Sequence, residues 1–259
     1  MIGNAMLGAI AGDIIGSRFE GQPPPAADFD LFHEHCRFTD DTVCTLAVAG
    51  ALMGERDFAA TLRRFVRRHP DRGYGGMFLS WAMTDGAPAY GSWGNGAPMR
   101  VAAVGWLTAS EEQARADAAA QAKVSHDHPD AVRAAEAVAL AILMARRGKD
   151  AAGIGAEIAG SYGYDLSPDQ ALAGGGFDVS ANGTVPPALV AALTADTWEG
   201  AVRTVIGLGG DTDTLACIAG AVAEARFGLP ETIATQARAH LTEDLETVLD
   251  RFLAAVEKT

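Results

Sequence analysis

The sequence predicts an all-α protein with a single compact domain over residues 1–259. Apolar residues make up 49% of the chain and aromatic residues only 7%, so the apolar content is mostly Ala, Val, Leu and Ile. With 30 glycines, this composition favours closely spaced helices over aromatic-rich strands. Helical periodicity dominates the chain, and strand-like alternation bounded by tight turns is almost absent. The length suits one large domain.

The individual helices follow from local signals. Residues 57–68 place apolar side chains on one side and arginines on the other, and this helix should end before Pro70, because proline disfavours helical backbone in the residue ahead of it. Ser110 begins a capping-box pattern that opens a helix at 110–124. Further helices are expected at 4–15, 40–53, 76–84, 98–109, 130–147, 150–160, 186–195, 198–206, 213–227 and 230–257. The Gly- and Pro-rich connections are 21–27, 70–76, 86–98 and 173–187.

Charge argues against nucleic acid as a direct partner. The formal net charge is −13, from 33 acidic and 20 basic residues, whereas phosphate neutralisation requires clustered Lys and Arg. The three cysteines, Cys36, Cys44 and Cys217, are an odd number without C-x-x-C spacing. They are interpreted as reduced thiols in or near the core of a cytoplasmic protein.

Membrane attachment and secretion are not expected. The apolar N-terminal stretch has no basic leader and is interrupted by Asp13, so it is a poor signal peptide. The longest wholly apolar runs, 137–145 and 215–223, are much shorter than the ~20 residues of a membrane span. Both runs are expected to be buried core helices.

Two acidic clusters carry the strongest functional signal. FTDDT (38–42) and GGDTDT (209–214) each place two aspartates and threonines directly before a strongly apolar helix. Such residues could simply cap the helices, since carboxylates near a helix N-terminus are stabilised by roughly 0.3–1 kcal/mol. For either cluster alone, capping is an equally good explanation. A cap needs one side chain, however, and close carboxylates suppress one another's ionisation unless a positive charge compensates.

Taken together, the clusters favour a metal centre. The candidate ligands all offer oxygen, which selects Mg²⁺, Mn²⁺ or Ca²⁺ over zinc. Four carboxylates from two helix ends suit a pair of divalent ions about 3.5–4 Å apart. The candidate ligands are Thr39, Asp40, Asp41, Asp211, Asp213 and Thr214.

At this point the chain resembles the ADP-ribosylglycohydrolases, a family that includes the ADP-ribosyl-acceptor hydrolases and the activating glycohydrolase of dinitrogenase reductase. The resemblance lies in an ordered set of motifs: GAIAGDIIGSRFEG (8–21), FTDDT (38–42), PDRGYGG (70–76), GSWGNGAPMR (91–100), GGDTDT (209–214) and, more weakly, VSHDHPDA (124–131). The resemblance implies an all-α fold with a dinuclear metal cleft holding two Mg²⁺ (or Mn²⁺) ions. It also implies that the six candidate ligands bind those ions.

The other motifs supply expected substrate contacts. The glycine-rich loop at 91–96 resembles a diphosphate cradle, although by itself it could be an ordinary tight loop. Trp93 could stack on a ribose or base, or simply pack. The pair His126 and His128 raises the possibility of zinc, but no Cys or third His is near in sequence; His128 is interpreted as a helix-entry residue. The residues that the resemblance assigns to substrate are Gly75, Gly76, Ser92, Trp93, Gly94, Asn95, Gly96 and His126.

The implied reaction is metal-dependent hydrolysis of the glycosidic bond between ADP-ribose and an acceptor, with an ADP-ribosylated protein side chain as the expected substrate. Glu20 and Asp41 are the candidates for proton handling, and the sequence does not rank them. Glu20 lies on a segment that can gate the cleft, although Pro23 to Pro25 stiffen it. The alternatives are hydrolysis of a free ADP-ribose conjugate or nucleotide derivative, and a non-catalytic ADP-ribose-binding relative. Nucleic acid is then expected only as a modified substrate.

Overall fold

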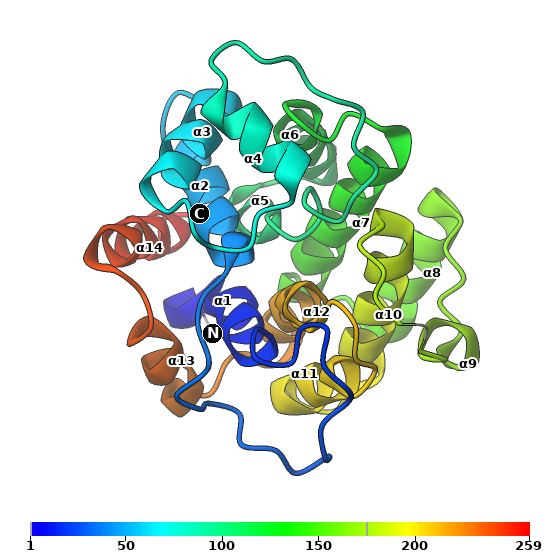
Figure 1. The fold of residues 1–259 in the computed structure, drawn as a ribbon. Helices are drawn as coiled ribbons and strands as arrows, with labels where there is room; N and C mark the ends of the chain where they lie inside the picture. The colour runs from blue at the N-terminus through cyan, green and yellow to red at the C-terminus, as the bar shows by residue number, and fades with distance from the viewer. Residues whose placement is uncertain (1, 175) are drawn as a thin grey trace.

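Helices account for all the regular structure in residues 2–174 and 176–259, the part of the chain that this computed structural model describes (Figure 1). This arrangement confirms the all-α prediction. In these residues the only β-type pairing is a single antiparallel bridge between Gly94 and Ser180. The helices are η1 (Ile2–Asn4), α1 (Leu7–Gly16), α2 (Asp40–Leu52), α3 (Phe58–Arg68), α4 (Gly76–Met83), α5 (Ala102–Leu107), α6 (Glu111–Lys123), α7 (Pro129–Arg146), α8 (Ala151–Tyr162), α9 (Pro168–Ala171), α10 (Ala181–Thr194), α11 (Trp198–Ile206), α12 (Thr212–Phe227), α13 (Glu231–Arg238) and α14 (Glu243–Val256).

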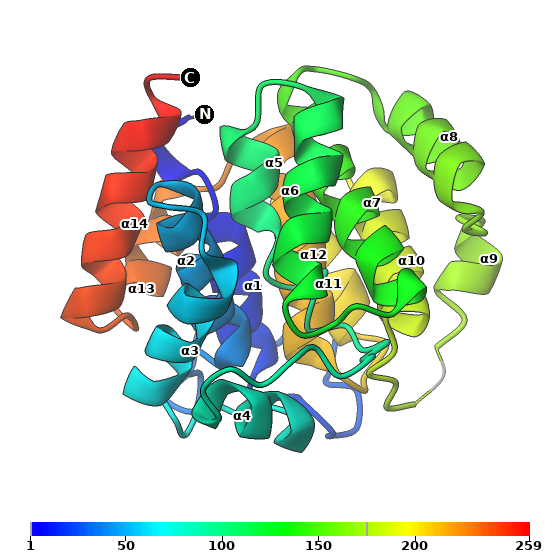
Figure 2. The same cartoon turned by 90° about the horizontal axis from the view of Figure 1, so that it is seen from above.

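The centre of the molecule is the packing of α1 against α12, which lie side by side in both views (Figures 1 and 2). Gly8, Gly12 and Gly16 are spaced four residues apart, so they share one face of α1. A Cβ atom added at Gly12 would lie 2.0 Å from the carbonyl oxygen of Ala216. The glycines therefore let the two backbones touch, which joins the first helix to one that lies about two hundred residues later.

The second central element is α7, whose residues Ala131–Ala145 are almost all buried. It packs against α5, α6, α8, α10 and α12, so it connects helices that come before it in the chain with helices that come after it. Helices α8 and α9 lie at the periphery in both views (Figures 1 and 2). The apolar run at 137–145 is thus a buried core helix, as predicted.

Two helices in the C-terminal half of the chain differ clearly from the sequence prediction. The helix expected at 230–257 is two helices, α13 and α14, because the chain turns at residues 239–242 and α14 restarts with an acidic first turn. The helix expected at 186–195 begins earlier, because Ser180 accepts a hydrogen bond from the amide of Gly183 and caps α10. The proline pair at 186–187 thus lies inside α10 and does not mark its start.

Other local predictions agree with the structure. Ser110 is the N-cap of α6 and accepts a hydrogen bond from the amide of Gln113. Helix α3 ends at Arg68, before Pro70. All three cysteines are buried, and none forms a disulfide within the described residues. Among those residues, no helix combines the length and the hydropathy that a membrane span requires.

Candidate metal centre and its cavity

A buried carboxylate of α1 organises the entrance to α2. Asp13 is fully buried and accepts hydrogen bonds from the amides of Thr39 and Thr42, at 3.0 and 3.1 Å. It also accepts from both threonine hydroxyls, the one from Thr39 at 2.6 Å. Burial raises the pKa of Asp13, and the four hydrogen bonds offset only part of that rise. Because Thr39 donates its proton to Asp13, the lone pairs of its hydroxyl oxygen are left for other partners.

The two acidic clusters meet in space. One carboxylate oxygen each from Asp13, Asp41 and Asp213 lies within 4.8 Å of the others, and the same holds for Glu20, Asp211 and Asp213. Asp213 belongs to both groups, so the groups adjoin one another. The hydroxyl of Thr214 donates to Asp41 at 3.3 Å, which links the starts of α2 and α12 directly.

The close approach of α1 and α12 brings these acids together. The hydroxyl of Thr212 donates to the carbonyl of Gly16 at 2.9 Å, which holds the start of α12 at the end of α1. Gly209 and Gly210 have φ angles of 74° and 80°, in the left-handed region that favours glycine. The chain can therefore turn sharply and place Asp211 at the start of α12.

The buried position of these acids favours either their protonated forms or a compensating positive charge. Burial raises the pKa of Asp41 well above its ordinary value, and the charge of Asp13 adds to that rise. Burial acts in the same way on Asp213, together with the charge of Asp41. The pKa of Asp40 is raised by burial and by Asp13. One oxygen each of Asp41 and Asp213 is buried without a hydrogen-bond partner in the described part of the chain.

Capping does not account for these aspartates. At α2 the cap is Thr39, whose hydroxyl oxygen accepts a hydrogen bond from the amide of Asp41 at 3.3 Å. At α12 the N-cap position is Asp211, but its side chain makes no capping hydrogen bond to any described residue. Buried, unpartnered carboxylate oxygens close together are the ligands that a hard divalent cation prefers. The residues present therefore fit Mg²⁺ or Mn²⁺.

The acids lie in the wall of a cavity of about 560 Å³, a size typical of small-molecule sites. Thirteen of the predicted site residues line it; they are Glu20, Asp40, Asp41, Gly75, Gly76, Ser92, Gly94, Asn95, Gly96, His126, Asp211, Asp213 and Thr214. Thr39 lies behind the lining, against Asp13 and Asp41. Trp93 also lies outside the lining, with 53% of its surface exposed, so it does not pack in the core.

The glycine-rich loop is tied to the acidic centre. The side-chain amide of Asn95 donates to Asp211 at 2.7 Å and to the hydroxyl of Thr184 at 3.0 Å. The backbone amide of Asn95 donates to the carbonyl of Val179. The helix that the sequence placed directly after the loop, at residue 98, begins only at Ala102, since turns occupy the intervening residues. Any anion bound by the loop would therefore contact loop amides and not that helix terminus.

His126 is held as a neutral imidazole above this loop. The guanidinium of Arg100 donates to the hydroxyl of Ser125 at 3.0 Å, and that hydroxyl lies 2.8 Å from Nδ1 of His126. Because a guanidinium can only donate, the serine proton is directed to Nδ1, and the imidazole proton resides on Nε2. Burial, and then the charge of Arg100, lower the pKa of His126 well below its ordinary value. Nε2 lies next to Gly96, where an added Cβ would be only 2.7 Å away.

Glu20 lies on the loop between α1 and α2, beside the acidic centre. The amide of Gly21 donates to the carbonyl of Gly210 at 2.9 Å, so the Glu20 loop contacts the turn that carries Asp211. Burial raises the pKa of Glu20, and the charge of Asp211 raises it further. Glu20 is exposed to solvent, and one of its carboxylate oxygens lies within 4.8 Å of an oxygen of Asp211 and of Asp213.

Sequence reasoning missed three features of this site. Asp13 was noted only as an interruption of an apolar stretch, although a lone carboxylate in an otherwise buried helix is itself a signal. Arg100 and Ser125, which orient His126, lie in the quoted motifs at 91–100 and 124–131, but the sequence assigned neither of them a role. Phe177 lines the cavity from a connection that the sequence marked only by its glycines. A second cavity of about 630 Å³ lies beyond this connection and shares Asp211.

Comparisons with known proteins identify the family of the chain. The chain is 25% identical to the ADP-ribosylhydrolase ARH3 of Mus musculus, across 87% of this chain and 83% of the relative. It is 25% identical to ARH3 of Homo sapiens, across 87% and 85%. A solved structure of an ADP-ribosylglycohydrolase-related protein complex superposes with a TM-score of 0.73 at 25% identity, covering 98% of this chain and 96% of that one. The sequence profile of the ADP-ribosylglycohydrolases matches residues 2–259, and the chain belongs to that family.

Proposed function

We propose that this protein is a metal-dependent hydrolase that cleaves the glycosidic bond between ADP-ribose and an acceptor, with an ADP-ribosylated protein side chain as the substrate. The observation that carries the proposal is the cluster of buried, partly unpartnered carboxylates at one wall of a ligand-sized cavity. The family match over nearly the whole chain supports it, as does the similarity to proteins named ADP-ribosylhydrolases. The same match supports one domain over 1–259.

The donor set supports a centre of two Mg²⁺ (or Mn²⁺) ions. Such ions would polarise the ribose hydroxyls and bound water and neutralise the surrounding acids. The residues that would hold them are Thr39, Asp40, Asp41, Asp211, Asp213 and Thr214. Asp13 is a positioning residue, because its oxygens already accept four hydrogen bonds from the start of α2.

The chain's own residues would bind and orient the substrate. The proton on Nε2 of His126 can donate to a ribose or phosphate oxygen above Gly96. The backbone amides of Gly94 and Asn95 already donate to the hydroxyl of Ser92 and the carbonyl of Val179, so the other amides of this glycine-rich loop would receive the diphosphate. Glu20 and Asp41 remain the two candidates for accepting a proton from attacking water and returning it to the leaving group. The exposed position and raised pKa of Glu20 favour it for exchange with solvent.

The acidic surface does not oppose an anionic substrate strongly. A single charge about 10 Å away in water contributes roughly 0.4 kcal/mol, and salt screens it further. Amides and cations in direct contact outweigh this repulsion. The three buried thiols are consistent with the predicted cytoplasmic location. With a net charge of −13, nucleic acid is proposed only as a possible carrier of the modification.

The test is the release of ADP-ribose from serine-linked, arginine-linked and nucleic-acid-linked conjugates, followed chromatographically. Mg²⁺-dependent release is expected for at least one conjugate, and chelator should abolish it. Asp41→Ala and Asp211→Ala should each abolish release while the helical circular dichroism persists. Asp28→Ala, at an exposed position on the Glu20 loop, is the control that should keep full activity.

Each result decides between named alternatives. Full activity in Asp41→Ala, Asp211→Ala or excess chelator would refute the metal-dependent mechanism. Release from a small conjugate but not from modified protein would favour the free-nucleotide hydrolase. Mg²⁺-dependent binding of ADP-ribose without cleavage of any conjugate would favour a binding protein.

A further inference from the structure

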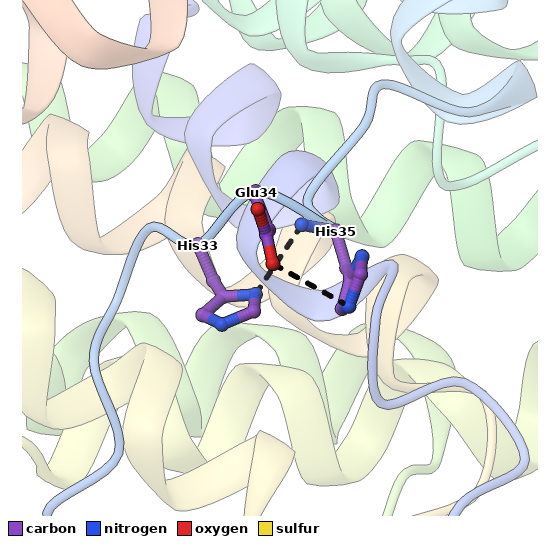
Figure 3. A group of neighbouring side chains, drawn as sticks. All are labelled: His33, Glu34 and His35. Atoms are coloured by element: carbon purple, nitrogen blue, oxygen red, sulfur yellow. Dashed lines mark hydrogen bonds and ion pairs between the residues drawn. The ribbon is translucent and has the colours of Figure 1, made fainter.

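A second group of metal-ligating side chains lies outside the acidic centre. His33, Glu34 and His35 are consecutive, all three are exposed, and one ligand atom from each lies within 4.8 Å of the others. Figure 3 shows the two imidazoles flanking the carboxylate of Glu34. Family resemblance assigns no role to these residues, and the proposed hydrolase mechanism does not use them.

The backbone explains why the three side chains gather. The amide of Cys36 donates to the carbonyl of His33 at 2.9 Å, which closes a four-residue turn. Within that turn, the amide of His35 donates to Nδ1 of His33 at 3.3 Å, and the two rings lie 4.9 Å apart (Figure 3). The turn therefore holds His33 beside its neighbours before any ligand arrives.

The flanks of the turn are anchored to the protein. Phe32 packs against the ring of His240, with ring centroids 5.6 Å apart. The thiol of Cys36 points to the carbonyl of Leu31 and is buried, so it does not join the three exposed ligands. The amide of Arg37 donates to the hydroxyl of Ser17. Because the backbone on both sides of the turn is held in place, less conformational entropy is lost when the three side chains are ordered around an ion.

The donor chemistry differs from that of the acidic centre. Two imidazoles and one carboxylate suit borderline ions such as Zn²⁺, whereas oxygen-only sites suit Mg²⁺. Ligands at about 2.1 Å from a tetrahedral zinc lie about 3.4 Å from one another. Nε2 of His35 is 4.0 Å from Oε1 of Glu34, so a side-chain shift of roughly 0.6 Å brings this pair to that separation. Both side chains are at least 75% exposed and free to make that movement.

We propose that the turn His33–His35 is a binding site for a Zn²⁺-class divalent ion, separate from the acidic centre. The three side chains supply three ligands, and water completes the coordination. The site lies on the loop that also carries Glu20, between α1 and α2. Binding of the ion should therefore stiffen the part of this loop around residues 31–37.

The test is calorimetric titration of the 259-residue chain with Zn²⁺ in millimolar Mg²⁺, which competes for the proposed oxygen-only centre. Wild type should bind Zn²⁺ at this turn. The double variant His33→Gln/His35→Gln should lose that binding, and Glu34→Gln should weaken it by roughly tenfold or more. Two controls, Cys36→Ser at the adjacent thiol and His128→Gln at the N-cap of α7, should bind as wild type does.

Hydrogen exchange supplies a second readout. Zn²⁺ should slow amide exchange over residues 31–37 in wild type and leave it unchanged in the double variant. The proposal is overturned if wild type binds no Zn²⁺ under these conditions, if the double variant still binds it, or if binding disappears in either control. None of these measurements uses hydrolysis, so this proposal and the proposed function can fail independently.

Discussion

Replacement of Gly12 by alanine tests whether contact between the backbones of α1 and α12 builds the acidic centre. The new Cβ would lie 2.0 Å from the carbonyl oxygen of Ala216 and 2.5 Å from its carbonyl carbon. A carbon normally approaches a carbonyl oxygen to about 3.3 Å, so the shortfall is roughly 1.3 Å. Both obstructing atoms are backbone, and no side-chain rotation can relieve the clash.

The expected change in the free energy of unfolding of Gly12→Ala follows from two opposing effects. Overpacking in a close-packed core costs typically 1–3 kcal/mol, and the upper part of that range applies where helices must separate. Alanine also gains up to about 1 kcal/mol of helix propensity over glycine. The net loss in the free energy of unfolding should be about 2 kcal/mol. For a chain of this size, that corresponds to a melting temperature roughly 4–8 °C lower.

The assay is thermal and urea unfolding followed by circular dichroism, with Gly160→Ala as the matched control. Gly160 lies in α8, and a Cβ added there meets no described atom within 4 Å. This control should stabilise the protein by about 0.5–1 kcal/mol, through propensity alone. If Gly12→Ala is as stable as wild type, or is stabilised as Gly160→Ala is, then the packing of α1 on α12 does not depend on direct backbone contact.

Three further predictions follow from the structure. Mg²⁺ at one hundred times its dissociation constant should stabilise wild type by about 2.7 kcal/mol but leave Asp213→Asn unchanged, as thermal shifts in Mg²⁺ and chelator will show. An equal shift in melting temperature with Mg²⁺ in both proteins would show that Asp213 is not a metal ligand. Gly96→Ala should weaken ADP-ribose binding in calorimetry by about tenfold, or 1.4 kcal/mol, because the added Cβ crowds Nε2 of His126; unchanged affinity would mean that the ligand binds elsewhere. Burial raises the pKa of Glu224 well above 4.5, and the nearby amides of Gly8 and Met6 offset only part of that rise. The folded protein thus favours the protonated acid, and wild type loses stability as pH rises from about 4.5 through the folded pKa. Glu224→Gln should therefore be more stable than wild type at pH 7.5 and similar to it near pH 4.5 in urea titrations, whereas a pH-independent difference would contradict this account.

The sequence was sufficient where the controlling physics is local. The all-α architecture follows from helical periodicity, and the cap at Ser110 follows from a pattern only four residues long. The same holds for the acidic clusters, since each sits at a helix start that the sequence marks. The prediction failed at residues 239–242 and before α10, where the acidic first turn of α14 and the cap at Ser180 were overlooked local signals.

Only the tertiary structure decided how these segments meet. Asp13 and Thr39 are 26 residues apart, and Gly16 and Thr212 are 196 apart, yet each pair is joined by hydrogen bonds. No local pattern encodes such pairs, because their proximity depends on glycines that allow α1 and α12 to touch. The sequence by itself identified the side chains that we propose to carry the chemistry. Packing determined which of them share one buried volume, and burial at close range is what turns ordinary aspartates into candidate metal ligands.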